Sequence, residues 1–195
     1  MLIPLNLFWK CEKNKETRKT VVYTGTLNKK FGVVNLIKAF HAIDNPNAIL
    51  KICGRGDSED LIKEYAKKDD RIHFLGQLSN EEAVKLQKNA TVLVNPRQNN
   101  EEFTKYSFPS KNMEYLLSGN PVIAYKLDGI PDEYNGYLLY VEENSLESFS
   151  SKISEVLNLT IQDRDDIGKR AREFVINNKN NNEASNKIIN MIKSN

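Results

Sequence analysis

The chain has 195 residues, which is enough for one domain with a sizeable core and short for two. Its 28 Lys and Arg residues nearly balance 26 Asp and Glu residues, and the net charge of +2 argues against non-specific nucleic-acid binding as its main task. The hydrophobic fraction of 39% is typical of a soluble globular protein, and no apolar run reaches the roughly 18–20 residues of a membrane-spanning helix.

Residues 1–19 precede the first expected strand. The stretch 1–9 is apolar, but no basic region precedes its apolar residues, and Pro4 and Asn6 interrupt it. We therefore do not expect a secretory signal peptide, and we interpret the stretch as a strap that packs against another surface. Residues 20–195 are expected to form one domain that includes the C-terminal helices.

Beyond residue 19, short apolar runs alternate with segments whose apolar residues recur at helical spacing. The polar tract 177–182, between the last two expected helices, is interpreted as a mobile joint. In chain order the patterns predict a strand at 20–24, a helix at 32–43, a strand at 48–53, a helix at 58–67, a strand at 72–75, a helix that opens at 79–82, a strand at 91–94, a helix at 109–117, strands at 121–125 and 137–141, and helices at 145–157, 163–175 and 183–193.

Strands that alternate with helices indicate right-handed βαβ units and a parallel sheet. About six strands suit an α/β fold of the doubly wound, Rossmann-like type. In such sheets, ligands bind beyond the carboxyl ends of the strands, at the point where the strand order reverses. The loops expected at that edge are 25–32, 54–58, 76–80, 95–108 and 126–135.

The stretch 106–114 carries the most specific chemical signal. Pro109 suits the first position of a helix, and the next backbone N–H groups, from Ser110 and Lys111, would then point out of the helix start. Free N–H groups, the positive end of the helix dipole and the Lys111 charge together favour an anion. Glu114 would lie roughly 7–8 Å further along the helix, a spacing that suits a nucleoside diphosphate. Taken alone, the stretch also fits an ordinary helix with an exposed Glu.

The loop after the first strand offers further phosphate-binding groups. Gly25 ends the strand and permits a close approach by backbone or ligand. Thr26, Lys29 and Lys30 follow it and carry donors suited to phosphate. The alternative interpretation is a glycine turn with solvated lysines.

The loop after the second strand contains Gly54 and Gly56, but it does not complete a dinucleotide-binding fingerprint, since Glu59 occupies the place of the third glycine. We interpret it as a turn that brings two backbones close together, followed by a helix that Asp57 or Ser58 caps.

The remaining candidates point to structural roles. Asp128, Asp132 and Glu133 share a turn-rich loop, and we expect them to be solvated rather than to bind a metal. Cys53 ends an apolar run, which indicates a buried free thiol and favours a reducing, cytoplasmic setting. The isolated His41 and His73 are interpreted as structural. Cys11 and Cys53 do not have the spacing of metal ligands. The sequence contains no motif for a serine or cysteine nucleophile.

Together, these loops resemble the C-terminal, donor-binding domain of a GT-B glycosyltransferase of the family 4 type, also described as glycosyl transferases group 1. The resemblance covers roughly residues 20–195 and implies one half of a GT-B architecture. The pieces that carry it are Tyr23-Thr-Gly25, Gly54 and Gly56, Phe74-Leu-Gly76, Ser79-Asn-Glu-Glu82, Phe108-Pro-Ser-Lys111 with Glu114, Gly119-Asn-Pro-Val122, Gly129-Ile-Pro131 and Asn135-Gly136.

The resemblance implies a nucleotide-sugar substrate, no cofactor and no metal, and it leaves the catalytic residues unassigned. It implies that Gly25, Thr26, Lys30, Ser110 and Lys111 bind the donor diphosphate and that Glu114 binds the ribose. The donor sugar would lie near Tyr106, Ser107, Phe108 and Pro109, and the base near Gly54, Arg55 and Leu78.

The chain departs from the family pattern at both ends of that site. Tyr106 stands where the family has the first acid of a Glu-x7-Glu pair, close to the transferred sugar. Thr26 stands where an Arg is common and Phe31 where a Lys is common, so Lys29 or Lys30 would have to supply the charge. The nucleotide end of the site is therefore expected to be better preserved than the sugar end.

The implied function is glycosyl transfer with retention, in the synthesis of a glycan or surface polysaccharide in the cytoplasm. The acceptor, a glycan or a lipid-linked molecule, would bind through an N-terminal domain for which this chain has no room, and that domain could also bring the enzyme to a membrane surface. We expect the strap 1–9 and the helix 183–193 to face it, and the chain alone to be inactive. The alternative is a non-catalytic, partner-binding or regulatory module derived from such a domain.

Overall fold

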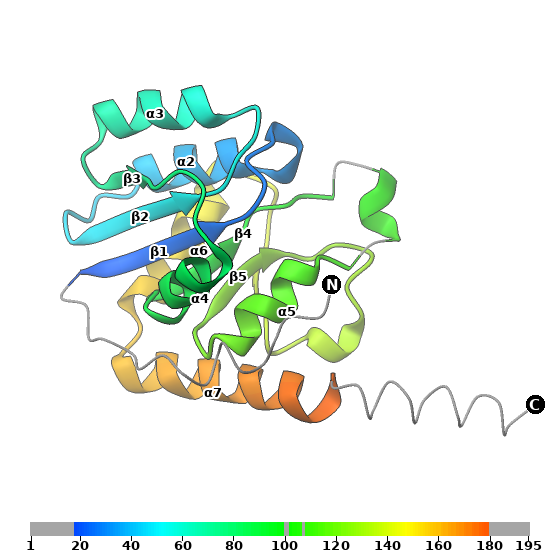
Figure 1. Cartoon of the computed structure of the whole chain (residues 1–195). Coiled ribbons are helices and arrows are strands. Elements are labelled where there is room, and N and C mark those ends of the chain that lie inside the picture. The colour runs from blue at the N-terminus through cyan, green and yellow to red at the C-terminus, as the bar shows by residue number, and fades with distance from the viewer. Residues whose placement is uncertain (1–17, 100–101, 107, 180–195) are drawn as a thin grey trace, which may run out of the picture.

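Six strands form one parallel sheet in the computed structural model, which describes residues 18–99, 102–106 and 108–179 (Figure 1). The strand order is β3-β2-β1-β4-β5-β6, so the predicted doubly wound, Rossmann-like α/β fold is confirmed. The strands are β1 (Lys19–Thr24), β2 (Ala48–Cys53), β3 (Ile72–Phe74), β4 (Val92–Asn95), β5 (Val122–Tyr125) and β6 (Leu139–Val141).

Helices cover both faces of the sheet, as right-handed crossovers require. In Figure 1, α4 and α5 lie in front of the sheet and α6 lies behind it. α2 packs against α6, and α5 packs against α7. The helices are α2 (Val33–His41), α3 (Glu59–Lys68), α4 (Asn80–Lys88), α5 (Ser110–Leu117), α6 (Leu146–Asn158) and α7 (Ile161–Asn178), with short 3-10 helices η1 (Lys29–Phe31), η2 (Glu102–Lys105) and η3 (Asp132–Tyr134).

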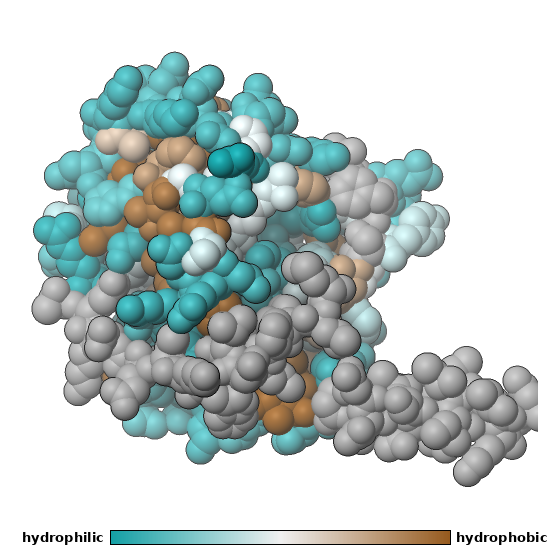
Figure 2. Space-filling model, viewed as in Figure 1, coloured by the Kyte–Doolittle hydropathy of each residue, from teal (hydrophilic) through white to brown (hydrophobic). Residues whose placement is uncertain are grey.

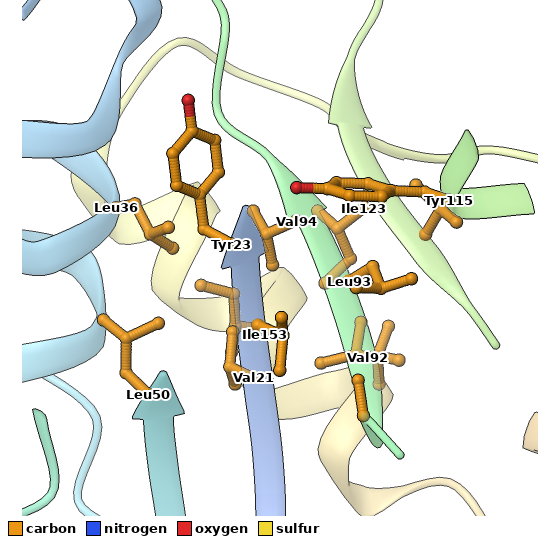
Figure 3. Packing of buried hydrophobic residues seen from close by; sticks show 14 of the residues in the cluster. Val21, Tyr23, Leu36, Leu50, Val92, Leu93, Val94, Tyr115, Ile123 and Ile153 are labelled. Carbon is orange, nitrogen blue, oxygen red and sulfur yellow. The ribbon is translucent and has the colours of Figure 1, made fainter. Parts of the chain in front are cut away.

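The core lies where the central strands meet both helical layers. Every residue of β4 and β5 is buried, as expected for parallel strands that are covered on two faces. Figure 3 shows Val21 and Val94 among the apolar side chains beside the sheet, together with Ile153 from α6. Cys53, at the end of β2, is buried and free, as predicted.

Helix α5 begins one residue later than predicted. Pro109 is not its first residue but its N-cap, with an extended backbone conformation, because the Pro109 carbonyl accepts the hydrogen bond of the Asn112 N–H at 2.8 Å. Ser110 and Lys111 therefore hold the first two helical positions, and their N–H groups have no partner within the helix.

The predicted side-chain cap is present at the start of α4 and absent at the start of α3. Ser79 and Glu82 form the predicted capping box at the start of α4. Ser58 occupies the N-cap of α3, but neither it nor Asp57 caps that helix through its side chain. The Ser58 hydroxyl instead donates to the Asp57 carboxylate at 2.9 Å.

Helix α7 is longer than predicted at both ends. Thr160 caps it by accepting a hydrogen bond from the Asp163 N–H, so the helix begins at Ile161. Asn177 and Asn178 belong to α7 rather than to a joint. Lys179 follows as the C-cap of α7. Residues 180–182 of the expected joint lie outside the described residues, as do the strap 1–9, Cys11, Ser107 and the expected helix 183–193.

Strands β1 and β4 separate at their carboxyl ends, and a side chain fills the gap. The two strands pair only at Val21↔Val92 and Val22↔Leu93. Beyond this point the hydroxyl of Tyr115, from α5, accepts from the Thr24 N–H at 2.8 Å and donates to the Thr24 carbonyl at 3.0 Å. Figure 3 shows the Tyr115 ring beside the end of β1. A fully buried side chain thus replaces the missing strand partner where the strand order reverses.

Among the coloured residues of Figure 2, hydrophilic ones cover most of the visible surface, and hydrophobic ones gather in smaller patches. Within the described ranges, none of the helices combines the length and apolar character that a membrane crossing requires.

An ionic clamp holds the opposite, amino-terminal edge of the sheet. Asp69 is buried, accepts from Nε and Nη2 of Arg71 at 2.9 and 2.7 Å, and is bonded to Nδ1 of His41 at 2.9 Å. Arg71 also donates to the carbonyls of Ile43 and Asn45, which follow α2. The Arg71 side chain holds the pKa of Asp69 well below its usual range, and this effect outweighs burial, which acts in the opposite direction.

Because the pKa of Asp69 is depressed in the folded state, its stabilisation is present above the unfolded pKa of about 3.9 and is lost as the pH falls below that value. We expect Asp69→Asn to lower the free energy of unfolding by about 2–3 kcal/mol at pH 7. The pH dependence of stability between about pH 5 and pH 2 should also become shallower. Urea unfolding at several pH values measures both effects. Asp60→Asn, whose side chain is 98% exposed, serves as the control, and equal pH profiles for Asp69→Asn and the wild type would contradict the clamp.

Candidate functional site

A pocket of about 190 Å³, lined by both polar and apolar groups, opens beyond the carboxyl ends of β1 and β4, between the loop after β1 and the start of α5. It therefore lies at the point where the strand order reverses, which is where doubly wound sheets bind ligands. The residues that line it are Tyr23, Thr24, Gly25, Thr26, Phe31, Asn95, Arg97, Pro109, Ser110 and Lys111.

The start of α5 forms one wall of this pocket and is anchored to the sheet. Asn95, at the end of β4, donates from Nδ2 to Oδ1 of the buried Asn112 at 2.6 Å. This bond fixes the first turn of α5 against β4, so the N–H groups of Ser110 and Lys111 have a set position beside the pocket. The helix dipole makes that position favourable for negative charge.

Lys111 and Glu114 form an ion pair one helical turn into α5, with Nζ and Oε2 2.8 Å apart. Glu114 also accepts from Nε2 of Gln87 at 2.5 Å, and the same amide donates to the Thr24 hydroxyl at 2.8 Å. The Lys111 side chain is 34% exposed and that of Glu114 only 13%. The network therefore holds the Glu114 carboxylate in place and leaves the Lys111 ammonium accessible from the pocket.

The loop after β2 packs directly against the backbone of the loop after β1. A Cβ on Gly54 would lie 1.7 Å from the Gly25 carbonyl oxygen, and one on Gly56 would lie 2.4 Å from the Leu27 carbonyl carbon. Backbone bonds join the loops, including Leu27 N–H to the Arg55 carbonyl at 2.8 Å. The predicted close approach of two backbones is confirmed, and both glycines serve to position the loop after β1.

The phenol and thiol near the pocket remain neutral. Tyr23 donates from its hydroxyl to the Thr26 carbonyl at 2.8 Å, and burial raises its pKa well above the usual range. Burial also raises the pKa of the Cys53 thiol to about 11, with Lys111 acting in the opposite direction. Neither group is thus prepared as a nucleophile or base at neutral pH.

Arg97, which the sequence interpretation missed, supplies a second cation to the pocket. Its guanidinium carbon lies 4.5 Å from the centroid of the Phe31 ring, which also lines the pocket. Burial lowers the pKa of this half-buried side chain. A signal was present, because Arg97 stands two residues after the end of β4, in a loop already assigned to the ligand-binding edge.

The pocket brings together most of the residues expected to bind a diphosphate. Gly25, Thr26, Ser110 and Lys111 line it, as does Pro109 from the expected sugar-side group. Lys30 does not belong to the lining; its ammonium lies over the Phe31 ring, 5.3 Å from the centroid. Glu114 lies beside the pocket through its ion pair with Lys111.

The residues expected near the sugar and the base are more scattered. Tyr106 is 84% exposed. Phe108 packs on Tyr134, with ring centroids 4.6 Å apart, and Tyr134 in turn packs on Phe174 of α7. Arg55 is exposed and Leu78 half-buried, each on its own loop of the ligand-binding edge.

The donor set of the pocket favours anions over metal ions. Among the described lining residues there is no carboxylate, and nowhere in the described parts of the chain do three His, Cys, Asp or Glu side chains gather as metal ligands. Asp132, in the loop after β5, is bonded to Lys126 and Asn135 instead.

A family model described as Glycosyl transferases group 1 matches residues 8–174. Sucrose-phosphate synthase from Thermosynechococcus elongatus has a similar structure, with a TM-score of 0.73 and 23% identity over 91% of this chain and 45% of that one. The C-terminal domain of a glycosyl transferase group 1 family protein from Francisella tularensis is also similar, with a TM-score of 0.67 and 18% identity. The match covers 92% of this chain and 99% of that one.

A mutant of TarM from S. aureus, in complex with Fondaparinux, alpha-GlcNAc-glycerol and UDP, gives a TM-score of 0.73 and 16% identity, over 92% of this chain and 37% of that chain. The chain thus spans less than half of the two longer structures. A search of curated protein sequences finds no match.

Proposed function

Because the chain belongs to the glycosyl transferases group 1 family, we propose that it is the donor-binding half of a glycosyltransferase. Its ligand would be a nucleoside diphosphate sugar. The observation that carries this proposal is the pocket at the ends of β1 and β4, where Lys111 and the start of α5 face the loop after β1. The UDP named in the TarM structure supports the same class of ligand.

The phosphate groups would bind at the start of α5. The N–H groups of Ser110 and Lys111 have no helical partner, and Lys111 adds a charged donor beside them. Gly25 and Thr26 close the pocket from the other side, where a backbone without a side chain at position 25 allows a close approach. These groups would also stabilise the negative charge that develops on the leaving diphosphate.

The ribose would bind at Glu114. A carboxylate accepts hydrogen bonds from two adjacent hydroxyls, and Glu114 is fixed for that purpose by Lys111 and Gln87. It follows Lys111 by three residues, about 4.5 Å along the helix axis. The ion pair also keeps the Glu114 charge from repelling the neighbouring phosphates.

Glycosyl transfer itself would need groups outside this pocket. The pocket would supply cations and backbone donors in place of a metal ion, and its described lining carries no carboxylate that would act as an acid or base. We propose that the acceptor, a glycan or a lipid-linked molecule, binds to another domain or chain, and that transfer proceeds with retention on the cytoplasmic side. The exposed Tyr106 lies on the chain segment next to the pocket and is open to such a partner.

Isothermal titration of the chain with UDP, GDP and ADP tests the proposal. We expect at least one to bind at millimolar concentration or tighter, and we expect EDTA to leave that binding unchanged. The corresponding nucleoside is the control, since it has the base and ribose but lacks the phosphates. If none of the three diphosphates binds at millimolar concentration, donor binding is wrong and the non-catalytic module becomes the better account.

A further inference from the structure

The loop after β1 contributes no cationic side chain to the described lining of the pocket, although its lysines suggested such a role in the sequence. Positions 26 and 31 in that loop are Thr and Phe, and both line the pocket. Lys30 is exposed and directs its ammonium over the Phe31 ring rather than into the lining. Among the described lining residues, the cations are Lys111 from α5 and Arg97 from the loop after β4.

The position of Arg97 is set by contacts on both sides. Its guanidinium stacks on Phe31, 4.5 Å from the ring centroid, and its backbone N–H donates to Oδ1 of Asn95. The neighbouring residues hold the same two loops together, since a Cβ on Gly32 would lie 2.0 Å from the Pro96 carbonyl oxygen. The ring and the guanidinium are therefore carried by two backbones in direct contact, which fixes the charge relative to the pocket.

The environment of Arg97 favours an anionic ligand. Burial lowers the pKa of Arg97 and Tyr23 acts in the opposite direction, but an arginine stays protonated at any physiological pH. Half-burial removes part of the water that would otherwise solvate the charge. The side chain lines the pocket, and a guanidinium presents two parallel N–H groups that match two oxygens of one phosphate.

We propose that Arg97 is a diphosphate-binding residue of this chain, with Phe31 as the residue that positions it. Arg97 binds one phosphate of the nucleoside diphosphate through its planar fork, and Lys111 with the first N–H groups of α5 binds the other. The inference rests on the proposed donor site and deepens it, because it assigns the second cation to the loop after β4 rather than to the lysines of the first loop.

Titrations with matched ligands test this assignment on the full chain. The probes are the nucleoside diphosphate that binds tightest among UDP, GDP and ADP, its monophosphate, and inorganic pyrophosphate. We expect Arg97→Ala to weaken diphosphate and pyrophosphate binding by about tenfold or more, and monophosphate binding by less. Arg97→Lys, which keeps the charge but loses the fork, should recover only part of the loss. Arg170→Ala, which removes an exposed charge on α7, is the matched control.

Phe31→Leu provides an independent variant, because it keeps the Arg97 charge and removes only the ring that positions it. A loss of a few-fold, again larger for the diphosphate than for the monophosphate, supports the inference. Equal diphosphate binding by Arg97→Ala and the wild type overturns it and leaves the donor site standing. Equal losses for all ligands, with a lower melting temperature, also overturn it by showing a purely structural role. A wild-type chain that binds none of the probes overturns both proposals.

Discussion

Replacing Lys111 with Ala is expected to weaken nucleoside diphosphate binding by about 10- to 100-fold, the effect of losing a hydrogen bond to a charged group. Two effects act in the same direction. The phosphate loses its ammonium partner, and Glu114 loses the cation 2.8 Å away that neutralises it. The uncompensated carboxylate, only 13% exposed, then lies beside the phosphate site and repels the ligand.

The chain offers a matched control for this variant. Lys152 and Glu155 on α6 form an ion pair with the same three-residue spacing, at 2.7 Å, and neither residue lines the pocket. Titration calorimetry with the tightest-binding diphosphate should show a large loss for Lys111→Ala and none for Lys152→Ala. Similar affinities for Lys111→Ala and the wild type would place the phosphates elsewhere. The double variant Lys111→Ala with Glu114→Gln should recover part of the affinity for inorganic pyrophosphate, which has no ribose to contact Glu114, because the repelling charge is removed.

Gly32→Ala is expected to destabilise the fold by more than about 3 kcal/mol. Gly32 is the N-cap of α2 and has a φ of 81°, a conformation that an L-residue adopts at a cost. In addition, its Cβ would lie 2.0 Å from the Pro96 carbonyl oxygen, a contact that only backbone movement can relieve. The variant therefore separates the loops after β1 and β4, and ligand affinity should fall with stability.

Gly136→Ala separates the two causes of this loss. Gly136 has a φ of 87°, nearly that of Gly32, but no atom lies within 4 Å of the position that its Cβ would occupy. It should therefore show only the conformational cost of about 1–2 kcal/mol. Urea unfolding of both variants measures the difference. If they are destabilised equally, the contact between Gly32 and Pro96 is not what holds the two loops together.

The sequence predicted the layers of this fold well because the signals were local. Apolar runs marked all six strands, and helical periodicity marked the α-helices of the described residues, with bounds that shifted by at most three residues. The start of α5 was misplaced by one residue, since a proline fits both the N-cap and the next position. α7 was predicted too short because hydrogen bonds of the Thr160 and Asn178 side chains, which the apolar pattern does not show, extend it at both ends.

The site was predictable only where one short motif contains it. Ser110, Lys111 and Glu114 share one helix, so their spacing along the chain gives their spacing in space. Arg97 and Phe31 are distant in sequence and meet only because β1 and β4 are neighbours, which no local pattern indicates. The same holds for Gln87, a buried amide on α4 that reaches both Thr24 and Glu114. Such pairs depend on which strands and helices become neighbours in the fold.

The side chains that join β1, β4, α4 and α5 have a consequence for the entropy of binding. Tyr115 pairs with the backbone of Thr24, Asn95 pairs with Asn112, and Gln87 bridges Thr24 and Glu114. The floor of the pocket is thus ordered before any ligand arrives, and immobilising it adds little to the cost of association. What remains to be ordered is the ligand together with the partly exposed Lys111 side chain. Changes to Lys111 and Arg97 should appear mainly in the dissociation rate of the ligand.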